Sequence, residues 1–273
     1  MNREEEGEGD GGRDDNNAVT LALTLKDVFG DSDSEDESHP LSRPSIRCNP
    51  PPMTKKQLAQ NVWEPVKEIN GLWLCRNFLS LQQQNDILYC IQQERWFEEP
   101  SKNQVMRFGN LPAWVLKLSG LVQCALCSYG VVCKICNIST SCAHDDENYC
   151  HLPVDLLWRE PLFDQMIVNA YQPGEGICAH VDLACFEDGI AIISLESVCV
   201  MEFTHENDKA LPSKKIPVLL NAGDLLFLCG EARYNWLHEI NRKPGHQIWD
   251  GKEIIQTKRI SITLRRLRLS HFQ

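Results

Sequence analysis

Residues 258–265 read Lys-Arg-Ile-Ser-Ile-Thr-Leu-Arg, an unbroken alternation of polar and apolar side chains near the end of a 273-residue chain. Successive side chains of a β-strand point to opposite faces of its sheet. One face of this predicted strand therefore carries only isoleucine and leucine, and the other carries Arg259 and Arg265 at its two ends. Because arginine binds carboxylates through two parallel hydrogen bonds, two guanidinium groups on one strand face suit a dicarboxylate ligand.

Similar strand-like runs precede this stretch and are separated by turn residues. They cover residues 166–171, 190–195, 198–203, 216–220 and 224–228. Short strands of this kind are typical of a jelly roll. Further upstream, residues 71–74 predict another strand, and residues 82–97 carry apolar side chains at helical spacing. We therefore expect a mainly β fold with N-terminal helices.

A candidate metal site begins at His180-Val-Asp182. In a strand, residues two apart point to the same side, so His180 and Asp182 can converge on one ion. His238, further along the chain, then completes two imidazoles and one carboxylate, the ligand set of the facial triad of non-haem Fe(II) oxygenases. Each part alone is weak, because a His-x-Asp tripeptide usually lies on a surface and a lone histidine is usually a core residue. The combination, followed by the two arginines, favours Fe(II).

With Asn169-Ala-Tyr171 added, these motifs resemble the AlkB-type Fe(II)/2-oxoglutarate dioxygenase family over roughly residues 69–269. The resemblance rests on residues 169–176, 180–182, 230–234 with His238, and 259–265. Residues 186–188, 194–195 and 200–203, together with the spacing from Arg233 to His238, are most similar to the AlkB homolog that acts on the tRNA wobble uridine.

The resemblance implies a double-stranded β-helix (jelly-roll) oxygenase core. It also implies that His180, Asp182 and His238 hold Fe(II), which leaves positions for 2-oxoglutarate and O₂. By the same resemblance, Asn169 and Tyr171 hydrogen-bond 2-oxoglutarate, Arg259 pairs with its distal carboxylate, and Arg265 lies near the carboxylate at the metal end. The implied reaction decarboxylates 2-oxoglutarate to succinate and CO₂ and hydroxylates a C–H bond; an N-linked methyl group would then leave as formaldehyde.

The expected substrate is a modified nucleic acid, with RNA or tRNA as the first choice. Ala184 stands where bacterial AlkB has an acid that helps to read the damaged base, and this departure speaks against repair of alkylated DNA. In the family, the region around Arg107, Phe108 and Trp114 forms part of the substrate lid, and these side chains can stack on or pair with a flipped base. The alternative is that Phe108 and Trp114 are ordinary core aromatics. Protein side-chain demethylation or hydroxylation is the second candidate function.

Cysteine is concentrated between residues 124 and 150. Cys124-x2-Cys127 and Cys133-x2-Cys136 are pairs of the kind that bind Zn²⁺ in a reduced protein. The two pairs are separated by only five residues, whereas a zinc ribbon leaves about 15 to 20. We interpret the stretch as an insertion into the domain, with a zinc site as a lesser possibility. An insertion that impairs the lid would leave a non-catalytic interaction module.

The net charge of −11 is unevenly distributed. Residues 1–47 hold thirteen acids and five bases, which leaves −3 for the rest of the chain. This composition predicts a disordered acidic tail and linker over residues 1–52, with the apolar island 21–29 as a motif for a protein partner. The remainder lacks the strongly basic footprint of a duplex-binding protein.

The thirteen cysteines and Fe(II) chemistry fit a reducing compartment. No apolar run approaches the ~18 to 20 residues of a membrane span. We expect a monomer in the nucleus, the cytoplasm or both.

Overall fold

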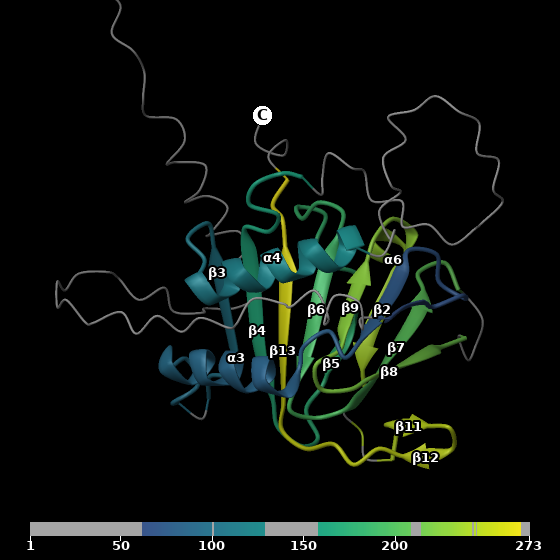
Figure 1. Ribbon diagram of the computed structural model, residues 1–273. Helices are drawn as coiled ribbons and strands as arrows, with labels where there is room; N and C mark the ends of the chain where they lie inside the picture. Colours follow the sequence, from purple (N-terminus) through teal and green to yellow (C-terminus); the bar gives the residue numbers. More distant parts are fainter. Residues whose placement is uncertain are drawn as a thin grey trace, which may run out of the picture. The chain divides into compact units, whose positions relative to one another are not determined.

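The fold was examined in a computed structural model, which describes residues 62–99, 101–128, 158–208, 214–241, 243 and 245–268 (Figure 1). The predicted acidic tail and linker at residues 1–52 lie outside the described residues. So do residues 129–150 of the Cys-rich stretch. The folded part starts before residue 69, because a strand at residues 62–65 already pairs with its successor.

Two antiparallel sheets make up most of the fold. The larger has the order β1-β2-β9-β6-β13-β4-β3, and the smaller has the order β5-β10-β7-β8. The larger sheet comprises β1 (Val62–Pro65), β2 (Leu72–Arg76), β3 (Gln104–Phe108), β4 (Gln165–Tyr171), β6 (Ile190–Leu195), β9 (Leu225–Leu228) and β13 (Arg259–Arg265). The smaller comprises β5 (Ile177–His180), β7 (Cys199–His205), β8 (Ile216–Leu220) and β10 (Trp236–Ile240). The mainly β jelly-roll prediction is confirmed.

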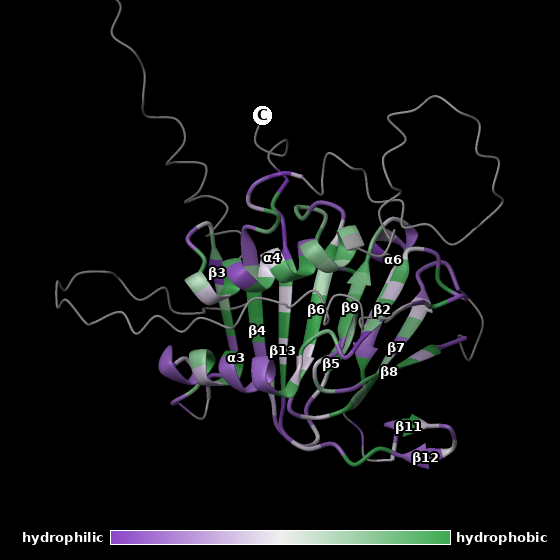
Figure 2. Ribbon diagram, viewed as in Figure 1, coloured by the Kyte–Doolittle hydropathy of each residue, from purple (hydrophilic) through white to green (hydrophobic). Residues whose placement is uncertain are grey.

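Side-chain alternation along the strands divides the core in two. Ile260, Ile262 and Leu264 of β13 belong to a cluster that packs the larger sheet against the helices α3 (Leu81–Gln93) and α4 (Ala113–Ser128). Figure 1 shows both helices crossing one face of that sheet, and Figure 2 shows the apolar strands beneath them. A second cluster, with residues such as Leu226 and Phe203 from the two sheets, fills the space between them. The polar face of β13 therefore looks toward the smaller sheet.

The first helix begins at a capping box. The Ser80 hydroxyl accepts a hydrogen bond from the Gln83 backbone N–H, and the Gln83 side chain accepts one from the Ser80 N–H. This satisfies two of the free donors at the helix start. The helix ends at Gln93, before the predicted end at Phe97, and Arg95 takes a left-handed backbone conformation (φ 60°) that cannot continue a right-handed helix.

The helix α4 was not anticipated. Its buried residues Val115, Leu118 and Val122 recur at helical spacing and pack against the larger sheet. Cys124 and Cys127 therefore lie in the last turns of this helix rather than in an inserted loop. A small hairpin, β11 (Ile248–Trp249) with β12 (Lys252–Glu253), lies between His238 and β13.

Candidate metal and co-substrate site

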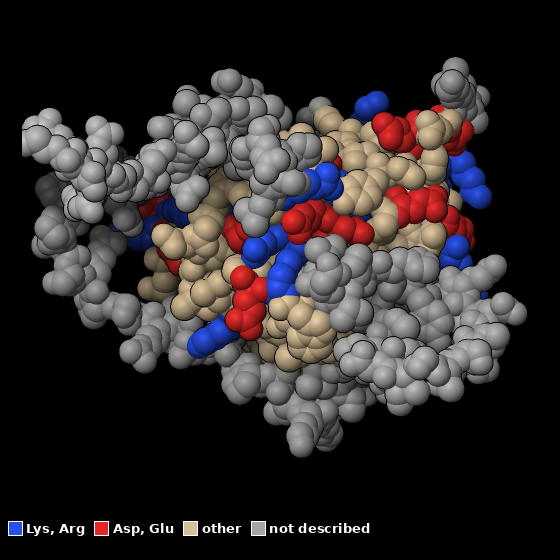
Figure 3. All heavy atoms as spheres, turned by 90° about the horizontal axis from the view of Figure 1, so that it is seen from above, with Lys and Arg blue, Asp and Glu red and all other residues tan. Residues whose placement is uncertain are grey.

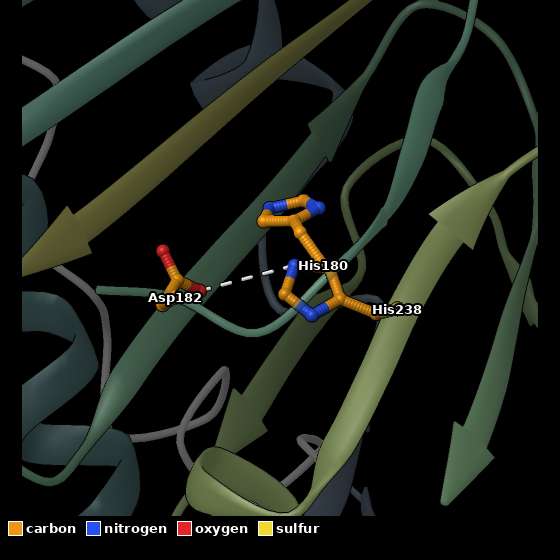
Figure 4. Close-up of side chains that lie close together, drawn as sticks. All are labelled: His180, Asp182 and His238. Carbon is orange, nitrogen blue, oxygen red and sulfur yellow. Dashed lines mark ion pairs between the residues drawn. The ribbon is translucent and has the colours of Figure 1, made fainter. Parts of the chain in front are cut away.

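His180, Asp182 and His238 come together between the two sheets (Figure 4). His180 ends β5 and lies directly opposite His238 of β10, so the pairing of these strands brings the two imidazoles side by side, with ring centroids 4.3 Å apart. Asp182 follows two residues after β5, and its Oδ2 is 3.8 Å from His238 Nε2. One potential ligand atom from each residue lies within 4.8 Å of the others. Among the described residues this is the only such group of three or more His, Cys, Asp or Glu side chains.

The protonation states suit a divalent cation. Burial, opposed by Asp182, lowers the pKa of His238 to about 4, so this imidazole is neutral near pH 7. The pKa of Asp182 is pulled in two directions: burial raises it, but Arg265, His238, Arg233 and His180 together hold it below its usual value. His180 Nδ1 lies 2.8 Å from the Cys178 carbonyl oxygen, which makes Nδ1 the donor and leaves Nε2 to bind metal. Two neutral imidazoles and one carboxylate are the donor set that Fe(II) takes in such sites.

Arg265 holds the Asp182 carboxylate in place. Its Nη1 donates to Asp182 Oδ1 at 2.6 Å, and its guanidinium lies 4.4 Å from the centre of the Phe186 ring. Both side chains of the ion pair are about 95% buried. With Oδ1 bound to Arg265, Oδ2 is the oxygen that points toward His238 and the metal position. Such outer-shell partners orient a ligand and set its charge.

Arg233 holds the backbone that carries Asp182. It lies on the short helix α6 (Glu231–Tyr234) and is 1% exposed. Its guanidinium donates to three carbonyl oxygens, those of Asp182 at 2.9 Å, Leu183 at 2.6 Å and Phe186 at 3.2 Å. In the sequence, Arg233 is informative only through its spacing to His238. That the side chain ties down the ligand-bearing loop is visible only in the folded structure.

Arg259 has the properties of an anion anchor. It is 1% exposed, its Nε donates to Ser194 Oγ at 2.9 Å, and both Nη atoms are buried without a hydrogen-bond partner. Buried donors left unpaired are costly, and one carboxylate would satisfy both in a bidentate pair. The arginine also lies 5.4 Å from the Tyr171 ring centroid. The residues present therefore fit one carboxylate of 2-oxoglutarate.

Tyr171 and Asn169 face the same side of the sheet as Arg259. Register places Tyr171 opposite Arg259 and Asn169 opposite Ser261. Burial raises the pKa of the Tyr171 phenol, with Arg259 opposing, so the hydroxyl stays protonated and able to donate. The structure thus gathers all four predicted co-substrate residues on the inner face of two neighbouring strands, β4 and β13.

Comparison with known proteins agrees with this geometry. The sequence profile of the 2OG-Fe(II) oxygenase superfamily matches residues 71–265. The chain belongs to this superfamily. The structure of OsALKBH1 superimposes with a TM-score of 0.51 over 75% of this chain and 100% of that one, at 14% identity, which shows a shared fold.

Among the sequence relatives of this chain are ALKBH8 proteins. The tRNA (carboxymethyluridine(34)-5-O)-methyltransferase ALKBH8 of Macaca fascicularis is 38% identical over 121 residues, which are 38% of this chain and 18% of that protein. The alkylated DNA repair protein ALKBH8 homolog of Arabidopsis thaliana is 36% identical over 122 residues, 38% of this chain and 34% of that protein. The oxygenase thus spans only a minor part of the length of these relatives.

The three residues predicted to contact substrate do not lie together. Phe108 ends β3 opposite Gln165, on the inner face that also carries Asn169. Arg107 points to the helix side, where its guanidinium lies 5.6 Å from the centre of the Trp96 ring. Trp114, 3% exposed, packs in the core under α4, 6.2 Å from Trp96 between ring centroids. Trp114 thus fits the alternative of a core aromatic, because α4 directs its ring into the helix–sheet interface.

Zinc binding at the Cys-rich stretch gains no support from the described residues. Cys124 and Cys127 lie on α4, and neither belongs to a metal-binding group within the described part of the chain. The other cysteines of the predicted cluster lie outside that part.

Proposed function

We propose that this oxygenase hydroxylates or oxidatively demethylates a modified RNA, with tRNA as the substrate class. The observation that carries the oxygenase chemistry is the triad of His180, Asp182 and His238, together with a buried Arg259 that has two unpaired Nη donors. The observation that favours RNA is the similarity of more than a third of the chain to ALKBH8 proteins, one of which is named as a tRNA (carboxymethyluridine(34)-5-O)-methyltransferase. Because the matched segments are small parts of those relatives, their substrates are carried over here as a proposal.

The protein's own residues prepare the site. Arg259 binds one carboxylate of 2-oxoglutarate through its Nη atoms, and Ser194 fixes the direction of that guanidinium through Nε. Arg265 and Arg233 keep the Asp182 carboxylate ionised and in place for the metal. Fe(II), when bound, supplies the activation of O₂ that oxidises the substrate C–H bond. Asp182 and His238 are buried, so bulk water has little access to these two side chains.

On the face shown in Figure 3, the charge distribution of the described residues favours a short or single-stranded target. In the view of Figure 3, basic and acidic side chains of the described residues are interspersed and form no continuous basic patch. Arg266 is paired with Asp164, and Arg159 with Glu187, so part of the positive charge is neutralised within the protein. Tight duplex binding depends on many unpaired basic contacts to phosphates. A flipped or unpaired nucleotide in an RNA loop requires fewer basic contacts to phosphates.

None of the helices in the described residues is long and apolar enough to cross a membrane.

Two assays test the proposal in sequence. Anaerobic titration with Fe(II) and then 2-oxoglutarate should produce the weak visible metal-to-ligand charge-transfer band. His180→Ala should abolish it, and because His180 is only half-buried, circular dichroism and melting temperature should change little. A band of wild-type intensity in the variant would rule out the triad.

Incubation with total tRNA, with single-stranded DNA carrying N-methylated bases and with methylated peptides then identifies the substrate class. The expected result is succinate above the substrate-free rate with tRNA, together with a nucleoside that has gained one oxygen or lost a methyl group by mass spectrometry. Stimulation by DNA or peptide but not by tRNA would overturn the RNA assignment and leave the oxygenase intact.

A further inference from the structure

The amide of Asn169 has two chemically opposite ends. Its oxygen accepts hydrogen bonds and its nitrogen donates them, so it can present only one kind of group to a ligand at a time. The carboxylates and keto group of 2-oxoglutarate only accept hydrogen bonds. Asn169 therefore helps to bind the co-substrate only when its Nδ2 points toward the site and its Oδ1 points away.

A neighbouring strand supplies a partner for Oδ1. Gln104 begins β3 and lies directly opposite Asn169 in the β3–β4 pair. Gln104 Nε2 donates to Asn169 Oδ1 at 2.8 Å. On its other side, Asn169 lies opposite Ser261 of β13, on the polar face that carries Arg259. With its oxygen bound to Gln104, the free end of the Asn169 amide is the donor Nδ2.

We propose that Gln104 is a positioning residue for co-substrate binding, which acts by fixing the orientation of the Asn169 amide. The inference rests on the proposed 2-oxoglutarate site. It adds Gln104 to that site, a residue that belongs to none of the sequence motifs described above. Gln104 does not need to touch the co-substrate. Its contribution is to prevent Asn169 from turning its oxygen toward a carboxylate.

Replacement of Gln104 by glutamate tests this directly. Glutamate has nearly the same shape but, when ionised, only accepts hydrogen bonds. Asn169 must then turn its Nδ2 toward residue 104 and its Oδ1 toward the co-substrate. Gln104→Met, similar in length but apolar, removes the anchor without imposing the wrong orientation. The effect should therefore be larger for Gln104→Glu than for Gln104→Met.

The readout is the dissociation constant of 2-oxoglutarate for the Fe(II)-loaded protein under anaerobic conditions, with the Fe(II) affinity measured separately. We expect Gln104→Met to weaken 2-oxoglutarate about two- to fivefold and Gln104→Glu about tenfold or more. Fe(II) affinity without co-substrate should stay within about twofold of wild type. Gln104 is only half-buried at a sheet edge, so the melting temperatures should stay close to that of wild type.

A second pair of variants removes the effect of the added negative charge. In an Asn169→Ala background no amide remains to be oriented, so Gln104→Glu can act only through its charge. The inference requires the Gln104→Glu penalty to shrink to about threefold or less in this background, the non-additivity expected of residues that act as a unit.

Three outcomes overturn the inference. One is an equal penalty in both backgrounds, another is wild-type binding by Gln104→Glu, and the third is tighter binding by Gln104→Glu, which would mean that the native amide pair has the reverse orientation. Failure of the wild-type protein to bind 2-oxoglutarate at all would instead contradict the proposed co-substrate site.

Discussion

Replacement of Arg259 by methionine should separate function from stability. The wild-type guanidinium is buried with two donors unpaired, an arrangement that is unfavourable unless an anion is present. Methionine fills much of the same volume without polar hydrogens. We therefore expect Arg259→Met to lose 2-oxoglutarate binding while the ligand-free protein keeps its stability or gains some.

The size of both effects follows from the contacts. Each hydrogen bond to a charged partner contributes about 1.5–3 kcal/mol, so loss of a bidentate pair removes about 3–6 kcal/mol of binding free energy. At about 1.4 kcal/mol per factor of ten, 2-oxoglutarate should bind about 10² to 10⁴ times more weakly. Two unpaired donors cost the ligand-free fold about 1–3 kcal/mol each, and the lost contacts to Ser194 and Tyr171 offset part of this. The net change in unfolding free energy should lie between zero and a gain of about 3 kcal/mol.

The assay combines anaerobic 2-oxoglutarate titration of the Fe(II)-loaded protein with thermal unfolding in the presence and absence of co-substrate. Wild type should melt at a higher temperature with 2-oxoglutarate, because a ligand that binds only the folded state stabilises it. Arg259→Met should show no such rise. Arg266→Met, which removes an arginine paired with Asp164, serves as the matched control and should bind co-substrate normally. Near wild-type affinity in Arg259→Met would place the co-substrate elsewhere, and a large loss of ligand-free stability would show that the guanidinium has a partner after all.

Three further predictions concern the support of the site and the core. Arg233→Met removes three hydrogen bonds to the loop that carries Asp182. It should therefore lower Fe(II) affinity at least tenfold and increase cleavage of that loop by added protease. Unchanged Fe(II) affinity would refute the positioning role of Arg233. Trp114→Ala should lower the unfolding free energy by about 3–5 kcal/mol, whereas Phe108→Ala should lower it far less but raise the KM for the nucleic acid. The reverse pattern would indicate that Trp114 contacts the substrate. Burial raises the pKa of the Cys75 thiol to about 12, so Cys75 should resist alkylation in the native protein at pH 8 while the exposed Cys178 reacts. Peptide mass mapping measures the labelling of each cysteine, and rapid labelling of both would contradict the burial of Cys75.

Local patterns in the sequence were sufficient to predict the strands and the candidate metal site. The alternation in β13 predicted which of its side chains share a face, and the His-x-Asp pair with a later histidine predicted the residues that the fold gathers into a candidate metal site. Both rest on short-range geometry, because the direction of a side chain in a strand is set by its own backbone. The AlkB-type resemblance, carried by the same motifs, predicted the superfamily that the profile match confirmed.

The helical elements were predicted less well. The expected helix over residues 82–97 exists but stops early, where Arg95 leaves the helical conformation. The helix α4 was missed because its apolar residues run into a Cys-rich stretch that looked like a loop. Whether Trp114 contacts substrate or core depended on how this helix packs on the sheet, which no residue near Trp114 specifies.

The partners of buried polar groups were decided only by the tertiary structure. Nothing in the sequence links Gln104 to Asn169, which lie 65 residues apart, or Arg233 to the carbonyl groups of the loop after His180. Strand alternation determines the face on which a side chain lies, but strand pairing and register determine which distant group it meets there. The sequence therefore specified the candidate metal ligands of this oxygenase, and the fold specified the residues that orient them.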